Sequence, residues 1–229
     1  MHRKILCLMI FAALAATVCA PRAMAFNAMT KKDILQDAIA FSPEHLRNYL
    51  EKYKDVVESG INYDVWAGGY IHPLTVGNVY RTLSVRVQTE PYSHNTLRGF
   101  GVLAGLVAEA IYPGDNFSSL QISPAEVKYD GIDKVGDPDE MAEALIETYR
   151  PYWKKTDRQV REILFEHAVN KVVDVWVAVW EDGGLDPGKP VETGKTISHA
   201  HKVLATPEEE TAKGGAPSDL PPDAPPPPK

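Results

Sequence analysis

The chain has 229 residues, with 31 acidic residues against 24 lysines and arginines, and its formal net charge is -7. This balance argues against sequence-independent binding to nucleic acid, which depends on lysine and arginine side chains that neutralise phosphates. The same charge opposes attraction to an anionic membrane surface. We therefore expect no nucleic-acid partner.

Residues 1–25 have the three parts of a signal peptide in order. Arg3 and Lys4 provide a positive start, an apolar run follows, and Ala23-Met24-Ala25 places small residues at the two positions that a signal peptidase reads. The apolar run is too short for a transmembrane anchor, which needs about 20 apolar residues. The sequence predicts export to the periplasm or the outside, with cleavage after Ala25 and a mature chain that begins at Phe26.

Both cysteines, Cys7 and Cys19, lie in this segment, so the mature chain has none. Lipid attachment at Cys19 is disfavoured because Val18 stands where a small residue precedes a lipidated cysteine. A mature chain of about 200 residues can be stable in an oxidising compartment from one hydrophobic core, without a disulfide. Loss of three basic and no acidic residues with the signal peptide would change the net charge from -7 to -10.

Helical spacing and capping patterns predict six helices and no strands between residues 26 and 184. Thr30 with Asp33 forms a capping pair at the start of the first helix, which runs to Phe41. Ser42-Pro43 opens the second helix, and Gly60 ends it.

The third helix is expected over residues 76–87 and the fourth over residues 95–112. The fourth is apolar on nearly all sides, so we expect it to be the buried central helix. Asp137-Pro138 caps the fifth helix, and Thr156 with Gln159 caps the sixth, which is the longest and ends at Gly183. These patterns predict an all-α domain over residues 26–184.

Residues 185–229 differ in composition from the rest of the chain. They hold ten of the eighteen prolines and an acidic run at residues 208–210. Such a segment cannot bury enough apolar surface to offset its ordering entropy, so we expect a disordered, proline-rich acidic tail. Its composition favours a semi-rigid spacer, and the alternative is a ligand for a protein partner that recognises proline.

Three stretches, in their order and spacing, resemble the zinc-dependent phospholipase C family and its relatives, the zinc nucleases that cut single-stranded nucleic acid. They are residues 37–60, residues 101–115 and residues 168–180. The second is similar to the family's central helix, in which His, then Asp, then Pro, then His follow one another. The resemblance covers most of residues 26–184 and implies a multi-helix, phospholipase C-like bundle around a buried central helix.

The resemblance also implies metal-assisted hydrolysis of a phospholipid or another phosphoester. In the family three zinc ions bind the phosphate oxygens and activate a bridging water as the nucleophile. The free amine and carbonyl of the first mature residue ligate zinc there, and Phe26 takes that position here. A backbone donor does not depend on the side chain.

Several ligand positions of the family are not retained. Lys31 stands roughly where the first helix should carry a histidine, and Gly105 and Asp115 replace the two histidines of the central stretch. Glu109 replaces the aspartate between them. Asp64 and His72 remain close to an aspartate and a histidine of the family's loop.

The candidate metal ligands are therefore Phe26, Asp64, His72, Glu109 and Asp115, with Asp64 also the candidate catalytic residue. Three carboxylates and one imidazole suit a hard divalent cation better than a full set of three zinc ions. The alternative interpretation makes Glu109 a charge on a helix face, Asp115 a turn residue and His72 an ordinary loop histidine.

Two other groups of polar residues allow a metal-binding interpretation. His167, Asn170 and Asp174 share one face of the sixth helix, and we favour a solvent-exposed polar face over a ligand set. His199 and His201 lie in the predicted tail, where two histidines on a flexible segment make a weak site.

The leading hypothesis is an exported, metal-poor relative of phospholipase C, weakly active or inactive, that binds a ligand or partner. The first alternative is an active metal-dependent phosphoesterase with a rearranged site. The second is a structural or assembly protein of the envelope that works through its proline-rich tail.

Overall fold

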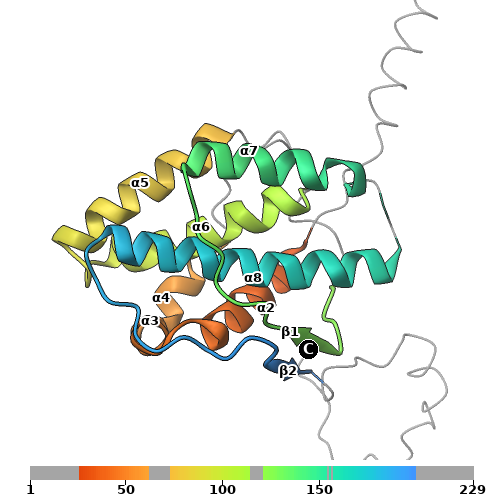
Figure 1. Cartoon of the computed structure of the whole chain (residues 1–229), viewed down its shortest axis with the longest axis horizontal. Coiled ribbons are helices and arrows are strands. Elements are labelled where there is room, and N and C mark those ends of the chain that lie inside the picture. The colour runs from red at the N-terminus through yellow and green to blue at the C-terminus, as the bar shows by residue number, and fades with distance from the viewer. Residues whose placement is uncertain (1–25, 62–72, 114–120, 154, 156, 200–229) are drawn as a thin grey trace, which may run out of the picture.

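The structure, a computed structural model, describes residues 26–61, 73–113, 121–153, 155 and 157–199 (Figure 1). The predicted signal peptide and the candidate site residues Asp64, His72 and Asp115 lie outside the described residues, as does the predicted tail from residue 200 onward. The described residues are mostly helical, which confirms the helical fold class. The phospholipase C-like arrangement itself stays a prediction.

Seven α-helices are described, together with one short 3-10 helix and two three-residue strands. In chain order they are α2 (Ala28–Phe41), α3 (Glu44–Lys52), α4 (Lys54–Glu58), α5 (Pro73–Thr89), α6 (His94–Ile111), β1 (Glu126–Lys128), α7 (Pro138–Tyr149), η1 (Arg150–Tyr152), α8 (Arg158–Asp182) and β2 (Thr196–Ser198). Figure 1 shows α5 and α7 on one side of α8, and α2, α3 and the strands on the other. The helices occur where the spacing predicts them, except that a break at Tyr53 divides the second predicted helix into α3 and α4.

Of three N-terminal capping residues predicted from the sequence, one is observed in the structure and two are replaced by a neighbouring residue. Asp137 caps α7 as expected, because its side chain accepts hydrogen bonds from the N–H groups of Asp139 and Glu140. The predicted cap Thr30 lies inside α2, where Asn27 accepts from the N–H of Thr30 at 2.8 Å. Asp157, rather than Thr156, caps α8. Asparagine and aspartate are stronger caps than threonine, which explains both shifts by a few residues.

The expected buried central helix is confirmed as α6, with twelve of its 18 residues buried. It contacts α2, α4, α5, α7 and α8. Small residues allow close approach on the α4 side: a Cβ atom on Gly60 would lie 2.1 Å from the carbonyl oxygen of Arg98, and one on Gly101 would lie 1.9 Å from that of Val57. The backbone after α4 therefore touches the backbone of α6, with no side chain between them.

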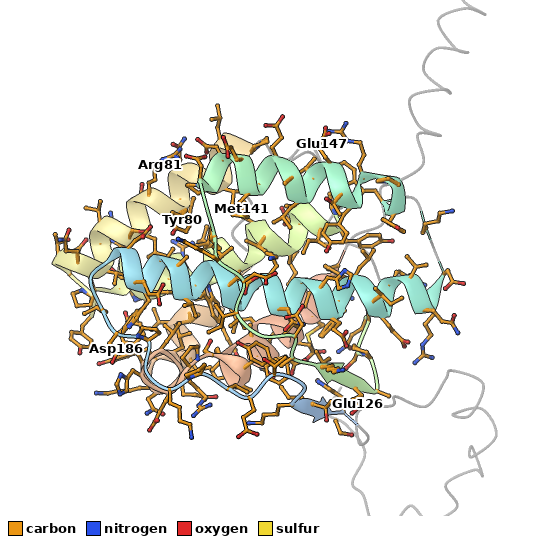
Figure 2. All side chains as sticks on the ribbon, viewed as in Figure 1. Tyr80, Arg81, Glu126, Met141, Glu147 and Asp186 are labelled. Carbon is orange, nitrogen blue, oxygen red and sulfur yellow. The ribbon has the colours of Figure 1, made fainter. Side chains whose placement is uncertain are left out.

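The segment 185–199 was expected in the disordered tail, and this expectation is wrong for these residues. Strand β2 pairs antiparallel with β1, with Val127 opposite Ile197. The N–H of Glu44 donates to the carbonyl of Lys189 at 2.9 Å, and the N–H of His45 donates to that of Pro187 at 3.0 Å. In Figure 2, Asp186 lies near α3, and Glu126 marks the strand that β2 joins. Composition missed this order because the hydrogen-bond partners come from distant parts of the chain.

Candidate functional site

The candidate site residue Glu109 forms an ion pair with Lys31 between α6 and α2. The Nζ atom of Lys31 donates to Oε1 of Glu109. The lysine side chain is 1% exposed and the glutamate side chain 20% exposed. A buried ammonium group needs an anionic partner because its desolvation is otherwise too costly. Glu109 thus neutralises a buried charge of the protein itself.

The side chain of Phe26, the candidate N-terminal ligand, is fully buried. The ring packs against Tyr112 with centroids 5.2 Å apart and against Phe165 with centroids 6.4 Å apart. Tyr112 follows the last turn of α6 and donates its hydroxyl to the carbonyl of Lys155 at 3.0 Å. The side chain of Phe26 therefore joins the start of α2 to α6 and α8.

Gly105, one of the positions that depart from the family pattern, has no room for a side chain. A Cβ atom there would lie 2.5 Å from the carbonyl oxygen of Ile61. This oxygen belongs to the backbone, so it can move only if the chain after α4 moves with it. The described structure is therefore closed at the position where the resemblance would require a histidine.

The described residues bring together Glu109 and Lys31, with Phe26 packed on the helix end that follows Glu109. Asp64, His72 and Asp115 lie outside the described residues. Within the described ranges, no three His, Cys, Asp or Glu side chains gather closely enough to hold a metal ion.

A second polar cluster holds the extended segment 128–133 against α8. Three side chains four residues apart on α8 accept hydrogen bonds from this segment: Glu166 from the N–H of Lys128 at 3.0 Å, Asn170 from that of Asp130 at 3.2 Å, and Asp174 from that of Asp133 at 2.8 Å. Asn170 also donates to the carbonyl of Lys128 at 2.9 Å. This row of side chains serves the backbone of 128–133 as a neighbouring strand would.

The expectation of a solvent-exposed polar face on α8 is therefore wrong for Asn170 and Asp174, which are both buried. Their polarity satisfies backbone groups that would otherwise be buried without partners. His167 is exposed, as expected, and its Nδ1 atom lies 3.0 Å from the hydroxyl of Tyr149.

Several acidic groups in and beside the second cluster have raised pKa values. Burial raises the pKa of Asp174 to about 6, against the opposing effect of its hydrogen bond from Lys171. Nζ of Lys171 lies 2.6 Å from Asp174 and 3.6 Å from Asp133. Burial also raises the pKa of Asp130 and, with the neighbouring carboxylates, that of Tyr129 to about 12. Both oxygens of Asp174 are bound within the protein, one by the N–H of Asp133 and the other by Lys171.

A buried pair joins α2 to the residue that follows β2: Asp37 lies on α2, and His199 comes directly after β2. The Nε2 atom of His199 is 3.0 Å from Oδ2 of Asp37, and both residues are buried. The sequence predicted His199 in a flexible tail, where it would make only a weak metal site, and the structure corrects the flexible placement because His199 is buried against Asp37. Asp37 and His199 are 162 positions apart, so no local pattern predicts their contact.

A groove of about 450 Å³ lies between the antiparallel helices α5 and α6. Helix α5 lines it with Asn78, Val79, Thr82, Leu83 and Arg86. Helix α6 lines it with Asn95, Arg98, Gly99 and Val102. Sequence reasoning missed this site, although the basic and amide residues recur at helical spacing on both helices. The sequence does not show that these faces of α5 and α6 lie side by side, and only the tertiary structure reveals it.

No helix within the described ranges is long and apolar enough to span a membrane.

Comparisons of the chain with protein-family models, with curated proteins and with solved structures found no match. The phospholipase C-like resemblance therefore rests on the sequence features alone.

Proposed function

We propose that this chain is an exported, non-hydrolytic binding protein, in which an internal ion pair stands in place of the metal site of a phospholipase C-like fold. The observation that carries the proposal is the contact between Lys31 and Glu109. Both residues occupy positions where the resemblance expects metal ligands, and here they bind each other.

The electrostatics of this pair oppose a divalent cation at Glu109. A metal ion near that carboxylate would face the ammonium group of Lys31, and like charges repel strongly where little water screens them. Binding would require Lys31 to lose its proton or to leave its buried position. Either change costs free energy. A site with a neutral imidazole at this position would bind the metal without that cost.

The closed position at Gly105 supports the same proposal. A ligand side chain there would need the backbone near Ile61 to withdraw. Three positions where the resemblance expects ligands are thus taken up within this protein: Lys31 and Glu109 form an ion pair, and the backbone of Ile61 fills the space beside Gly105. Lys31, Glu109 and Gly105 are not among the residues that line the groove between α5 and α6, and this groove supports a binding role.

The test uses the processed protein, residues 26–229, purified without chelator and dialysed against zinc. We expect fewer than about 0.5 tightly bound zinc ions per chain by elemental analysis. We also expect no chelator-sensitive hydrolysis of phosphatidylcholine or of a soluble phosphodiester. Two or three tightly bound zinc ions together with chelator-sensitive turnover would overturn the proposal in favour of the active phosphoesterase.

Two matched variants test whether any bound zinc depends on Glu109. Glu109→Gln removes the candidate ligand, and Glu58→Gln alters a comparable carboxylate that pairs with Lys32 at 2.8 Å. If wild-type protein binds zinc and only Glu109→Gln loses it, Glu109 is a metal ligand and the ion pair does not replace the site.

A further inference from the structure

We propose that the groove between α5 and α6 binds a small amphipathic anion, a molecule with an apolar body and one carboxylate or phosphate group. This proposal deepens the binding role proposed above by naming a ligand class. It depends on neither the resemblance nor the absence of a metal site.

The groove has the size and lining of a small-molecule site. Its volume of about 450 Å³ falls within the range of about 300–1,000 Å³ that is usual for ligand pockets. Leu83 forms a buried apolar floor, and the half-buried Val79 and Val102 flank it. The two helices are close here, since a Cβ atom on Gly99 would lie 2.8 Å from Cδ1 of Leu83.

The charges in the groove favour an anion. Arg86 from α5 and Arg98 from α6 are both among the residues that line the groove, one on each of its two helices. Arginine presents several N–H donors in a planar arrangement that matches carboxylate and phosphate oxygens.

Uncharged polar side chains complete the site. Asn78, Thr82 and Asn95 line the groove and can donate hydrogen bonds to oxygen atoms of a ligand. An apolar floor with a few polar groups at its edge binds a molecule that is apolar at one end and charged at the other.

The carboxylate of Glu90 neutralises part of the charge of Arg86. Oε1 of Glu90, in the turn between the two helices, lies 3.2 Å from NH1 of Arg86. Both side chains are substantially exposed, so this pair is weak and a ligand anion can displace it. Removal of the Glu90 charge should therefore strengthen anion binding, whereas it would not strengthen binding of an uncharged ligand.

The experiment is calorimetric titration of residues 26–229 with four probes that share one apolar body. n-Octanoate and n-octyl phosphate test the two anionic groups, n-octanol tests the apolar body alone, and n-octylammonium tests the opposite charge. We expect binding of at least one anion, at least tenfold tighter than n-octanol, and no heat from n-octylammonium. The tighter of the two anions identifies the charged group.

The variants test the position of the anion. Arg86→Gln and Arg98→Gln should each weaken binding about tenfold, the usual effect of losing a hydrogen bond to a charged group. Glu90→Gln should strengthen binding several-fold. The matched control is Arg158→Gln, because Arg158 forms the same type of pair four residues apart with Glu162 on α8, away from the groove.

Three results would overturn the proposal: no binding of either anion at millimolar concentration, equal binding of n-octanol and the anions, or equal effects of Arg86→Gln and Arg158→Gln. Arg86→Lys retains the charge and keeps the test decisive if the glutamine variant fails to fold. None of these results bears on zinc content, so failure here and failure of the proposed function are distinguishable.

Discussion

Asp37 on α2 and His199 at the end of β2 form a buried contact, with Oδ2 and Nε2 3.0 Å apart. Their side chains are 7% and 6% exposed. The N–H of His199 also donates to the carbonyl of Ala125 at 2.8 Å, so one residue joins α2, β1 and the C-terminal segment. This contact, together with the pairing of β1 and β2, holds the end of segment 185–199 against α2.

We expect His199→Ala to destabilise the protein by about 1–3 kcal/mol, because it removes a buried polar partner of Asp37. Urea unfolding followed by circular dichroism measures the change. The control is His45→Ala, which alters an exposed histidine 3.6 Å from Asp186 and should change stability by less than about 0.5 kcal/mol. Equal effects of the two variants would show that the buried contact contributes nothing.

The same contact predicts where the chain can be shortened. A chain that ends at residue 184 loses β2 and the backbone hydrogen bonds of Pro187 and Lys189 to α3. Its thermal midpoint should therefore fall well below that of a chain ending at residue 199. Differential scanning calorimetry of the two truncated proteins makes the comparison. Identical midpoints would restore the domain boundary at 184 that composition predicts.

Lys31→Met should destabilise the protein by about 3–5 kcal/mol, because it leaves the carboxylate of Glu109 without this cation. Lys32→Met is the control on the same helix: Lys32 pairs with Glu58 at 2.8 Å but is 43% exposed, so its loss should cost about 1 kcal/mol or less. The double variant Lys31→Met with Glu109→Gln should recover part of the loss in chemical unfolding. Strict additivity of the two changes would argue against the ion pair.

The raised pKa of Asp174 should make the protein less stable as the pH rises from about 4 to about 6. Its pKa is raised by burial from 3.8 to about 6, so the folded protein holds a proton that the unfolded chain releases between these values. The stability that this group contributes is therefore fully present below about pH 4 and is lost as the pH rises through about 6.

Comparison with Asp174→Asn isolates this effect. The stability of wild type relative to Asp174→Asn should increase on the order of 2 kcal/mol between pH 7 and pH 4. Urea unfolding of both proteins at four pH values measures it. A difference that is constant with pH, or that grows toward neutral pH, would contradict the raised pKa.

Gly105→Ala should destabilise the protein by about 1–3 kcal/mol, the usual cost of forcing extra volume into a packed interior. The added Cβ atom would lie 2.5 Å from the backbone oxygen of Ile61. Gly136→Ala is the control, because a Cβ atom there meets nothing within 4 Å. Thermal unfolding compares the two variants. A neutral Gly105→Ala would show that the backbone after α4 yields easily, which would weaken the argument for a closed ligand position.

The positions of the helices follow from the sequence because their causes are local. Apolar spacing and capping depend on residues three or four positions apart, so α5, α6, α7 and α8 lie close to their predicted ranges. The errors at Thr30 and Thr156 are of the same local kind, since a stronger cap lay within three residues. Buried polar residues on α8 were harder to interpret, because helical spacing shows that Asn170 and Asp174 share a face but not what covers it.

The sequence by itself determined a helical domain with a buried helix near residues 95–112 and a proline-rich C-terminal region. Only the tertiary structure decided which charges meet. Lys31 and Glu109 are 78 positions apart, and Asp37 and His199 are 162 apart. Their pairing depends on how α2 packs against α6 and where β2 joins β1. A charged side chain carries no local mark of its partner, because the free energy that selects the partner arises only when packing removes both from water.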